Sequence, residues 1–384
     1  MFNHVSRRFV LTGLGAATIA GPAIGGGPKK SLRPQMRNGK PPMRVDAGVG
    51  ALIQAAGLSG AVACAVADVK TGRVLEAFNG NTGLPPASVA KALTTLYALE
   101  VLGAEYRFTT RIMTTGRVQN GILTGDVILA GGGDPTLTTD DLATMAAGLK
   151  SAGIREVRGA FRVFDGFLPY VHSIDAQQPD QLGYSPAVSG IALNYNRVHF
   201  EWKRGVNGYA VSMDARTKRY RPAVQMARMK VVNRRVPVYT YADRNGADHW
   251  TVARQALGNK GARWLPVRKP ALYVGDVFRT LARTQGIVLS APKTDRALSK
   301  KAQTVVRHNS AALRVIIKGM LKYSNNLTAE MVGMTASAAR GGKPASLKVS
   351  ALRMSRWAGQ RYGMTGTRMV DHSGLGDASR MAPA

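Results

Sequence analysis

Two adjacent prolines, Pro85 and Pro86, fix where one helix of this chain begins, because they end an extended segment and apolar residues then recur at helical spacing from 93 to 101. Ser88 and Lys91 lie at the head of this helix, so that a hydroxyl and an amine share one face about one turn apart. The positive end of the helix dipole favours an alkoxide and disfavours a protonated lysine. A hydroxyl beside a neutral amine is the nucleophile and general-base pair of serine acyl-transfer enzymes, so we expect covalent chemistry on a carbonyl.

The Ser-x-x-Lys spacing is short enough to arise by chance, and it occurs a second time at Ser290-Ala-Pro-Lys293. The second copy contains Pro292, which blocks the helix that would align the two side chains. For Ser88 and Lys91, an ordinary helix start with a solvated lysine is the alternative interpretation of the spacing alone.

Composition indicates a folded, basic protein of more than one domain. The chain has 384 residues, 45% of them hydrophobic, which is ample for two or more cores. Its formal net charge of +31 favours an anionic partner. No zinc-finger spacing, aromatic-basic interleaving or basic zipper accompanies this charge, so we expect no nucleic-acid binding. Peripheral contact with an anionic cell wall or membrane surface fits better if the protein is exported.

The N-terminus predicts export. Arg7 and Arg8 precede a mildly apolar run that is too short and too rich in glycine to span a bilayer, which is typical of a twin-arginine signal. We expect the signal at residues 1–27, a basic linker at 28–44, and a periplasmic location in a bacterium. Cys64 is the single cysteine, so no intrachain disulfide forms, and its alternating apolar surroundings predict a small buried side chain.

Further along, residues 60–78 read as a β-hairpin with a turn at 68–72, and residues 142–149 and 274–283 read as helices. Strand-like runs occur at 127–129, 161–164 and 236–239. An apolar stripe from Leu313 to Leu321 predicts a helix that ends at 322–326, and a second helix follows at 327–334. Such a break is a good place to present polar side chains into a cleft.

Four segments in this order carry a family resemblance. They are Pro86-Ala87-Ser88-Val89-Ala90-Lys91, Gly131-Gly132-Gly133-Asp134-Pro135-Thr136-Leu137, Tyr323-Ser324-Asn325-Asn326, and Asp371-His372-Ser373-Gly374-Leu375. From about residue 45 onward the chain resembles the D-alanyl-D-alanine carboxypeptidase/endopeptidase family, the low-molecular-mass class C penicillin-binding proteins. About 230 residues separate Lys91 from Ser324, far more than a compact serine β-lactamase needs.

The resemblance implies an α/β (α+β) fold, a penicillin-binding/β-lactamase-type transpeptidase domain with helices around an antiparallel sheet. That domain would be discontinuous, at residues 45–109 and 300–384, with mainly-β domains inserted at 110–299. Asp134 reads as a turn residue rather than a catalytic acid.

The resemblance also implies catalytic roles. Ser88 would be the nucleophile and Lys91 the general base, Ser324 would relay a proton, and Asn326 would position substrate and Lys91. The substrates would be peptidoglycan stem peptides and their cross-links, and β-lactam antibiotics would acylate Ser88. No cofactor is implied, and the six scattered histidines give no zinc spacing, so we expect no metal.

The family also has a third motif, Lys-Thr/Ser-Gly, on a strand that lines the cleft. Lys70-Thr71-Gly72 matches this motif in sequence, but it precedes Ser88 and lies at the tip of the predicted hairpin. His372-Ser373-Gly374 reads as a loop. We therefore expect a C-terminally truncated chain, a fragment with an incomplete central sheet and doubtful activity of its own. A serine β-lactamase and a non-catalytic penicillin- or cell-wall-binding protein are the alternative functions.

Overall fold

The structure is a computed structural model that describes residues 48–384. The chain divides into two compact units, of which the first ends at Leu58 and the second begins at Ser59. The described part of the first unit contains helix α2 (Val49–Ala55). The predicted export signal and basic linker lie outside the described residues. No helix within 48–384 is long and apolar enough to cross a membrane.

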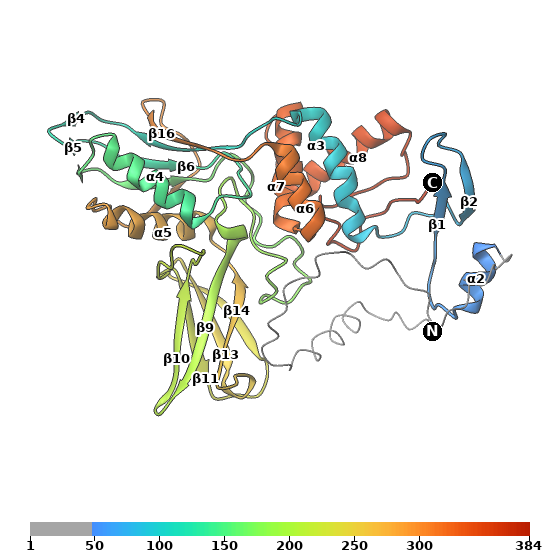
Figure 1. The fold of residues 1–384 in the computed structure, drawn as a ribbon, viewed down its shortest axis with the longest axis horizontal. Coiled ribbons are helices and arrows are strands. Elements are labelled where there is room, and N and C mark those ends of the chain that lie inside the picture. Colours follow the sequence, from blue (N-terminus) through green and yellow to red (C-terminus); the bar gives the residue numbers. More distant parts are fainter. Residues whose placement is uncertain (1–47) are drawn as a thin grey trace, which may run out of the picture. The chain divides into compact units, whose positions relative to one another are not determined.

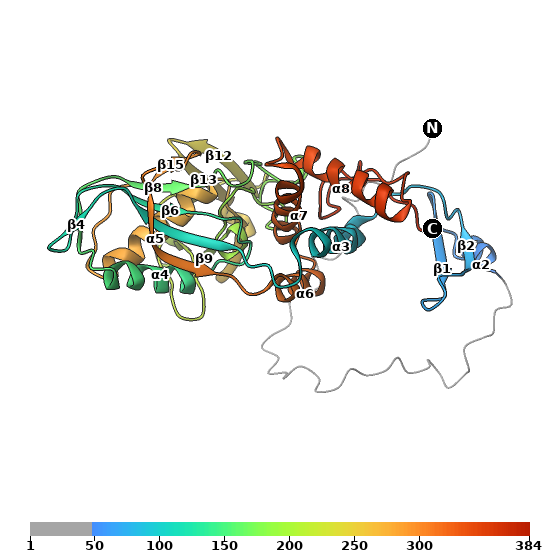
Figure 2. The same ribbon diagram turned by 90° about the horizontal axis from the view of Figure 1, so that it is seen from above.

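Four helices of the second unit pack around one core: α3 (Ala90–Leu102), α6 (Leu313–Tyr323), α7 (Asn326–Gly341) and α8 (Leu347–Tyr362). Figures 1 and 2 show them side by side, although more than two hundred residues separate α3 from α6. Helix α7 is buried without interruption from Leu327 to Ser337, as expected for a central helix. The helices predicted after Ser88, from Leu313 and from Leu327 are confirmed, with longer bounds.

The predicted hairpin is also confirmed, as strands β1 (Cys64–Ala67) and β2 (Val74–Phe78) in antiparallel register. At its turn, one Asp68 oxygen accepts hydrogen bonds from the backbone of Lys70 and Thr71, so Lys70-Thr71-Gly72 is a turn. Within 48–384 this pair of strands joins no further strand. Its apolar side chains stay largely exposed, with Val66, Val74 and Leu75 each more than half accessible.

The region between α3 and α6 contains a five-stranded sheet of order β15-β8-β6-β3-β16, to which both the start and the end of the region contribute strands. Its strands are β3 (Thr109–Thr114), β6 (Val127–Ala130), β8 (Phe161–Phe164), β15 (Lys293–Asp295) and β16 (Gln303–Asn309). Two helices, α4 (Thr139–Ser151) and α5 (Pro270–Thr284), lie beside this sheet (Figure 1). The short strands β4 (Val118–Gln119), β5 (Ile122–Leu123) and β7 (Glu156–Val157) form a separate small sheet.

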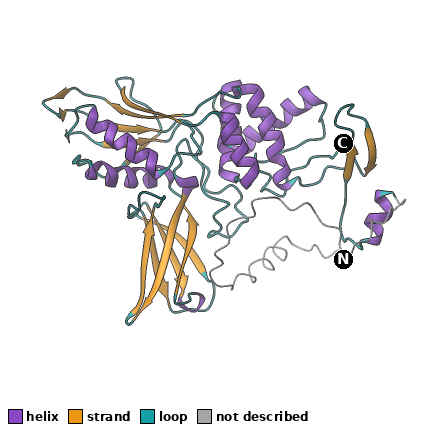
Figure 3. Ribbon diagram, in the orientation of Figure 1, coloured by secondary structure: helices purple, strands orange, loops and turns teal. Residues whose placement is uncertain are grey.

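Two three-stranded sheets complete this region, and Figure 3 shows their long strands. Strands β9 (Arg197–Gly205), β10 (Gly208–Asp214) and β14 (Lys260–Pro266) have the order β10-β9-β14. Strands β11 (Ala227–Val232), β12 (Tyr239–Arg244) and β13 (Ala247–Ala253) have the order β11-β13-β12. The predicted strand at 236–239 is wrong, because β12 begins only at Tyr239. Pro237 has no N–H to donate to a neighbouring strand.

The two connections between the helices and this region run side by side. Ser310 N donates to the Phe108 carbonyl over 2.9 Å, and Thr109 Oγ1 donates to Asn309 Oδ1 over 2.9 Å. Because β16 pairs with β3, residues 303–309 share a sheet with 109–114. The boundaries 110–299 of the inserted domains remain a prediction.

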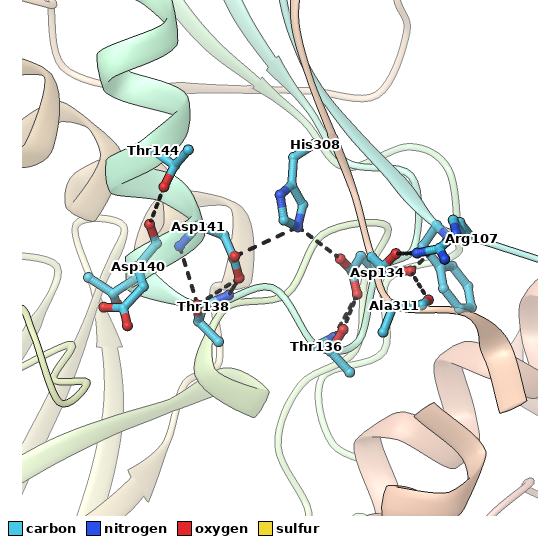
Figure 4. Close-up of polar contacts among 12 residues, drawn as sticks. Arg107, Asp134, Thr136, Thr138, Asp140, Asp141, Thr144, His308 and Ala311 are labelled. Carbon is cyan, nitrogen blue, oxygen red and sulfur yellow. Dashed lines mark hydrogen bonds and ion pairs between the residues drawn. The ribbon is translucent and has the colours of Figure 1, made fainter. Parts of the chain in front are cut away.

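Figure 4 shows the surroundings of this crossing, where Asp134 comes close to His308 of β16. Asp134 Oδ1 accepts hydrogen bonds from both the backbone N–H and the hydroxyl of Thr136. The Asp134 carboxylate also lies 3.9 Å from His308 Nε2. The predicted turn role of Asp134 agrees with these contacts.

Candidate active site

Ser88 lies in a single 3₁₀ turn, Ala87–Val89, that leads directly into α3. The turn leaves the Ser88 side chain exposed and places Lys91 in the first turn of the α-helix, where it is buried. The Lys91 Nζ atom is 3.0 Å from Ser88 Oγ. The exposed Ser88 hydroxyl therefore lies within hydrogen-bonding distance of the buried Lys91 amine, which is the arrangement that the Ser-x-x-Lys spacing predicts.

The burial of Lys91 shifts its amine toward the neutral form. Its side chain is 1% exposed, and Nζ donates to the Ser373 carbonyl over 2.9 Å. Burial lowers the pKa of Lys91, while the nearby carboxyls of Glu330 and Asp371 act in the opposite direction. With one N–H directed at a carbonyl, a neutral Lys91 can direct its lone pair at Ser88 Oγ.

Ser324 approaches the same hydroxyl from the end of α6. Its Oγ atom is 2.7 Å from Ser88 Oγ. Ser324 terminates α6 in the left-handed conformation, with φ 52° and ψ 41°, which a non-glycine residue adopts only at a cost of about 1–3 kcal/mol. The break between α6 and α7 thus turns the serine hydroxyl toward Ser88, as the sequence pattern predicts for a cleft-facing bend.

The two asparagines that follow have different partners. Asn325 caps α7, because its Oδ1 accepts from Thr328 N over 2.9 Å. Asn326 is the first residue of α7, and its Nδ2 donates to the Tyr184 carbonyl over 3.0 Å. The hydrogen bond from Asn326 to Lys91 that the resemblance implies is absent from the contacts found within residues 48–384.

Beneath Lys91 lies a buried loop, residues 371–376, whose contribution the sequence did not reveal. Glu330 of α7 accepts hydrogen bonds from the backbone N–H groups of His372 and Ser373, over 2.8 and 2.9 Å. Asp371 accepts from Gly374 N and Gly376 N, over 2.6 Å each. Glu330 therefore holds the loop from α7, and Asp371 holds it from within. The loop presents the Ser373 carbonyl to Lys91.

Burial controls the ionisation of this carboxyl pair. Burial, followed by the neighbouring Asp371, raises the pKa of Glu330 to about 8. Burial likewise raises the pKa of Asp371, against the effect of its two backbone hydrogen bonds. The sequence offered one indication that Glu330 is special, since it is the one acidic residue in the apolar run 327–334. Nothing in the sequence indicated the role of the Ser373 carbonyl, because a backbone group does not depend on residue type.

Two glycines allow this loop to approach the helices. A Cβ atom on Gly374, whose φ is +74°, would lie 1.7 Å from the Ala87 carbonyl oxygen, next to Ser88. A Cβ atom on Gly333 of α7 would lie 2.3 Å from the His372 ring. His372-Ser373-Gly374 is thus a loop, as predicted, and it packs beneath the turn that carries Ser88.

A pocket of about 290 Å³ adjoins Ser324. It is lined by the bend at residues 323–327 and by residues that include Tyr184, Tyr195, Arg197 and Trp264. The Arg197 guanidinium lies 5.5 Å from the Tyr195 ring centre and 5.7 Å from that of Trp264. Within residues 48–384, no three His, Cys, Asp or Glu side chains gather in a way that could hold a metal ion.

The second Ser-x-x-Lys copy forms no comparable site. Ser290 Oγ accepts from Phe161 N, and Lys293 begins strand β15 rather than a helix. This agrees with the expectation that Pro292 prevents a helix there.

Comparison with known proteins shows to which family the chain belongs. Residues 45–384 match the model of the D-Ala-D-Ala carboxypeptidase 3 (S13) family. The D-alanyl-D-alanine carboxypeptidase of an Actinomadura species is 27% identical over 311 residues, which cover 74% of this chain and 55% of the relative. D-alanyl-D-alanine carboxypeptidase DacB of Haemophilus influenzae is 23% identical over 338 residues, which cover 82% of this chain and 67% of the relative. The chain thus spans between about half and two thirds of the length of these relatives.

The fold is shared with a solved structure as well. Penicillin binding protein 4 (dacB) from Haemophilus influenzae superposes with a TM-score of 0.70 at 20% identity, over 85% of this chain and 73% of the other. The family match covers all of the described residues. The chain belongs to the D-Ala-D-Ala carboxypeptidase 3 (S13) family, whose penicillin-binding fold it shares.

Proposed function

We propose that this protein is a serine-type D-Ala-D-Ala carboxypeptidase/endopeptidase that acts on peptidoglycan stem peptides and their cross-links. One observation carries the proposal: Ser88 Oγ lies between Lys91 Nζ and Ser324 Oγ, at 3.0 and 2.7 Å. A nucleophile with a base on one side and a second proton carrier on the other fits a two-step acyl transfer. Both relatives described above are named D-alanyl-D-alanine carboxypeptidases.

In the first step, Ser88 Oγ attacks the carbonyl carbon between two D-alanine residues while Lys91 Nζ takes the hydroxyl proton. The buried amine is suited to this, since burial lowers its pKa and the Ser373 carbonyl orients one of its N–H bonds. The tetrahedral intermediate collapses as the C–N bond breaks, and the leaving amine receives a proton through the Ser324 hydroxyl. This leaves an ester on Ser88 and a free D-alanine or the released peptide.

In the second step, water attacks the ester carbonyl. The proton of the water passes to Lys91, and Ser88 recovers its own proton as the C–O bond breaks. Asn326, at the edge of the pocket, has its carboxamide oriented by the Tyr184 carbonyl and serves to hold the peptide backbone of the substrate. A β-lactam resembles the D-Ala-D-Ala end and acylates Ser88 in the same way. One solved structure of the Haemophilus protein is described as a complex with a β-lactam.

Labelling with a fluorescent penicillin tests the proposal. We expect stoichiometric labelling of the chain that Ser88→Ala abolishes, together with release of D-alanine from a stem pentapeptide. Label that persists in Ser88→Ala would remove Ser88 as the nucleophile. Labelling without D-alanine release would indicate a non-catalytic penicillin-binding protein, and rapid hydrolysis of a chromogenic cephalosporin would indicate a β-lactamase.

We further propose that the chain is exported to the periplasm by a twin-arginine signal at residues 1–27. Arg7 and Arg8 motivate this, and the net charge of +31 suits peripheral contact with an anionic wall or membrane surface after export. The test is cell fractionation of the protein and of its Arg7→Lys/Arg8→Lys variant. Unchanged periplasmic recovery of the variant would contradict the signal assignment.

A further inference from the structure

Arg268 is a buried arginine about which the proposed mechanism says nothing. It lies between β14 and α5, and its side chain is 2% exposed. Burial lowers its pKa, against the effect of Asp180 and Asp248. Arginine stays charged even so, because its intrinsic pKa is far above neutrality. Burying such a charge is costly unless its N–H groups find partners, so those partners indicate what the residue holds.

The Arg268 guanidinium donates to three backbone carbonyls of one irregular segment, residues 172–185, and its Nη2 also lies 3.7 Å from Asp180 Oδ1 of the same segment. Nη1 donates to His172 O over 3.1 Å and to Ser185 O over 2.7 Å, and Nη2 donates to Asp180 O over 2.7 Å. The guanidinium is planar, so its N–H groups have a fixed relative direction. One side chain therefore sets the separation of both ends and the middle of the segment.

This segment reaches the active site at Tyr184, the neighbour of Ser185. The Tyr184 carbonyl accepts the hydrogen bond from Asn326 Nδ2 over 3.0 Å, and Gly183, Tyr184 and Pro186 line the pocket beside Ser324. A continuous path of hydrogen bonds and covalent bonds thus runs from Arg268 through Ser185 and Tyr184 to Asn326.

The far side of Arg268 is anchored independently. Its backbone N–H donates to Asp248 Oδ2 over 2.8 Å, and the other oxygen of Asp248 accepts from the Tyr241 hydroxyl. Asp248 and Tyr241 belong to the sheet β11-β13-β12. The Arg268 backbone is therefore hydrogen-bonded to this sheet, while its guanidinium binds the irregular segment 172–185.

We propose that Arg268 is a positioning residue: by binding three carbonyls of residues 172–185, it sets the Tyr184 carbonyl that orients the Asn326 carboxamide toward substrate. This inference rests on the proposed function. Lysine at this position keeps the charge but offers a point donor that cannot hold three separated carbonyls at once. The geometry of the fork, rather than its charge, is the active feature.

The first experiment measures the second-order rate of acylation by fluorescent penicillin in Arg268→Gln and Arg268→Lys. We expect losses of about 30-fold and about 10-fold. Arg279→Gln is the matched control, because Arg279 donates to the Leu289 carbonyl in the same region and makes no bond to the segment 172–185. The control should change the rate less than twofold.

A double-mutant cycle separates positioning from general loss of structure. If Arg268 acts through Asn326, Arg268→Gln should reduce acylation less than threefold in an Asn326→Ala background. Equal losses in both backgrounds would overturn the proposal. If the wild-type chain itself takes up no label, the proposed function fails instead.

The positioning of the segment is testable without activity. Hydrogen exchange by mass spectrometry should show at least tenfold faster exchange of amides in residues 175–185 in Arg268→Lys, with no change in Arg279→Gln. Several of these amides are hydrogen-bonded within the segment, for example Asp175 N to Ser185 Oγ and Ser185 N to Leu182 O. Unchanged protection of 175–185 would overturn the proposal regardless of the labelling result.

Discussion

Two buried basic side chains, Lys91 and Arg268, are accommodated in opposite ways. Both side chains are at most 2% exposed, and both direct N–H groups at backbone carbonyls. Lys91 makes one such bond and faces a serine hydroxyl, whereas Arg268 makes three and faces no reacting group. A buried lysine can release its proton, but a buried arginine cannot.

The difference teaches how burial can serve either chemistry or architecture. Around Lys91, burial lowers the pKa of the amine and raises the pKa of Glu330, so several protonation states lie close in free energy. Around Arg268 the cation is permanent, and burial raises the pKa of Asp248, which accepts the Arg268 backbone N–H, to about 6. The first environment can move a proton, and the second holds a loop.

Exchanging the two residue types gives the largest expected effect. Lys91→Arg places a permanent cation beside Ser88 and cannot supply a neutral base, so acylation by penicillin should fall about 10⁴-fold. Arg268→Lys should cost only about tenfold. A Lys91→Arg chain that still reacts within tenfold of wild type would remove the distinction between the two cations.

The carboxyl beneath Lys91 should make stability depend on pH. The folded-state pKa of Glu330 is raised from 4.5 to about 8, so its contribution is fully present below pH 4.5 and is lost as pH rises through 8. The free energy of unfolding should therefore fall across this window, by on the order of 5 kcal/mol. Urea titrations of wild type and Glu330→Gln at pH 5 and 8 measure it. An equal slope in Glu330→Gln would assign the dependence to other groups.

The carboxyl beside Arg268 should titrate over a lower and narrower range. The pKa of Asp248 rises from 3.8 to about 6, so its contribution is present below pH 3.8 and is lost as pH passes 6, amounting to about 3 kcal/mol. Asp248→Asn should flatten the stability curve between pH 4 and 6 and leave the range from 6.5 to 8 unchanged. If Asp248→Asn instead altered the upper range, the two environments would not be independent.

A single methyl group should disturb the Lys91 environment alone. In Gly374→Ala the added Cβ meets the Ala87 carbonyl, and unfolding free energy should fall about 2 kcal/mol more than in the control Gly363→Ala. Gly363 has a similar φ of +71° but open space around its Cβ position. Acylation should fall in Gly374→Ala, while hydrogen exchange of residues 175–185 stays at the wild-type rate. Faster exchange there would show that the two regions are coupled.

Local patterns predicted much of the fold that positions the site. The helix after Ser88, the break at Ser324 and the hairpin at 60–78 all follow from periodicity, proline and turn residues, which act over a few positions. The strand predicted at 236–239 was wrong because the prediction followed the apolar residues and disregarded Pro237, which has no backbone N–H to donate to a neighbouring strand. The predicted helices were too short. Capping by Thr138 starts α4 three residues earlier than predicted, and α7 continues past Met334 to Gly341, where Gly342 ends it.

The supporting residues of the site could not be predicted in this way. Lys91 and the Ser373 carbonyl are 282 positions apart, and a backbone carbonyl has no signature in the residue it belongs to. Arg268 has ordinary neighbours in the sequence, and its importance arises only where residues 172–185 fold around it. The expected contact of Asn326 with Lys91 was replaced by one with Tyr184 for the same reason.

The adjacent connections at residues 106–109 and 309–313 make the long middle portion of this protein modular. Because Thr109 and Asn309 already touch, a two- or three-residue turn would suffice to join them, and the four-helix core would keep its own contacts. Evolution could thus enlarge, exchange or remove the portion between them by a single event at one spot. Such a change would keep Ser88, Lys91 and Ser324 on the helical core, but it would remove the pocket wall around Tyr184 and the apolar side chains within residues 168–192 that pack against α7.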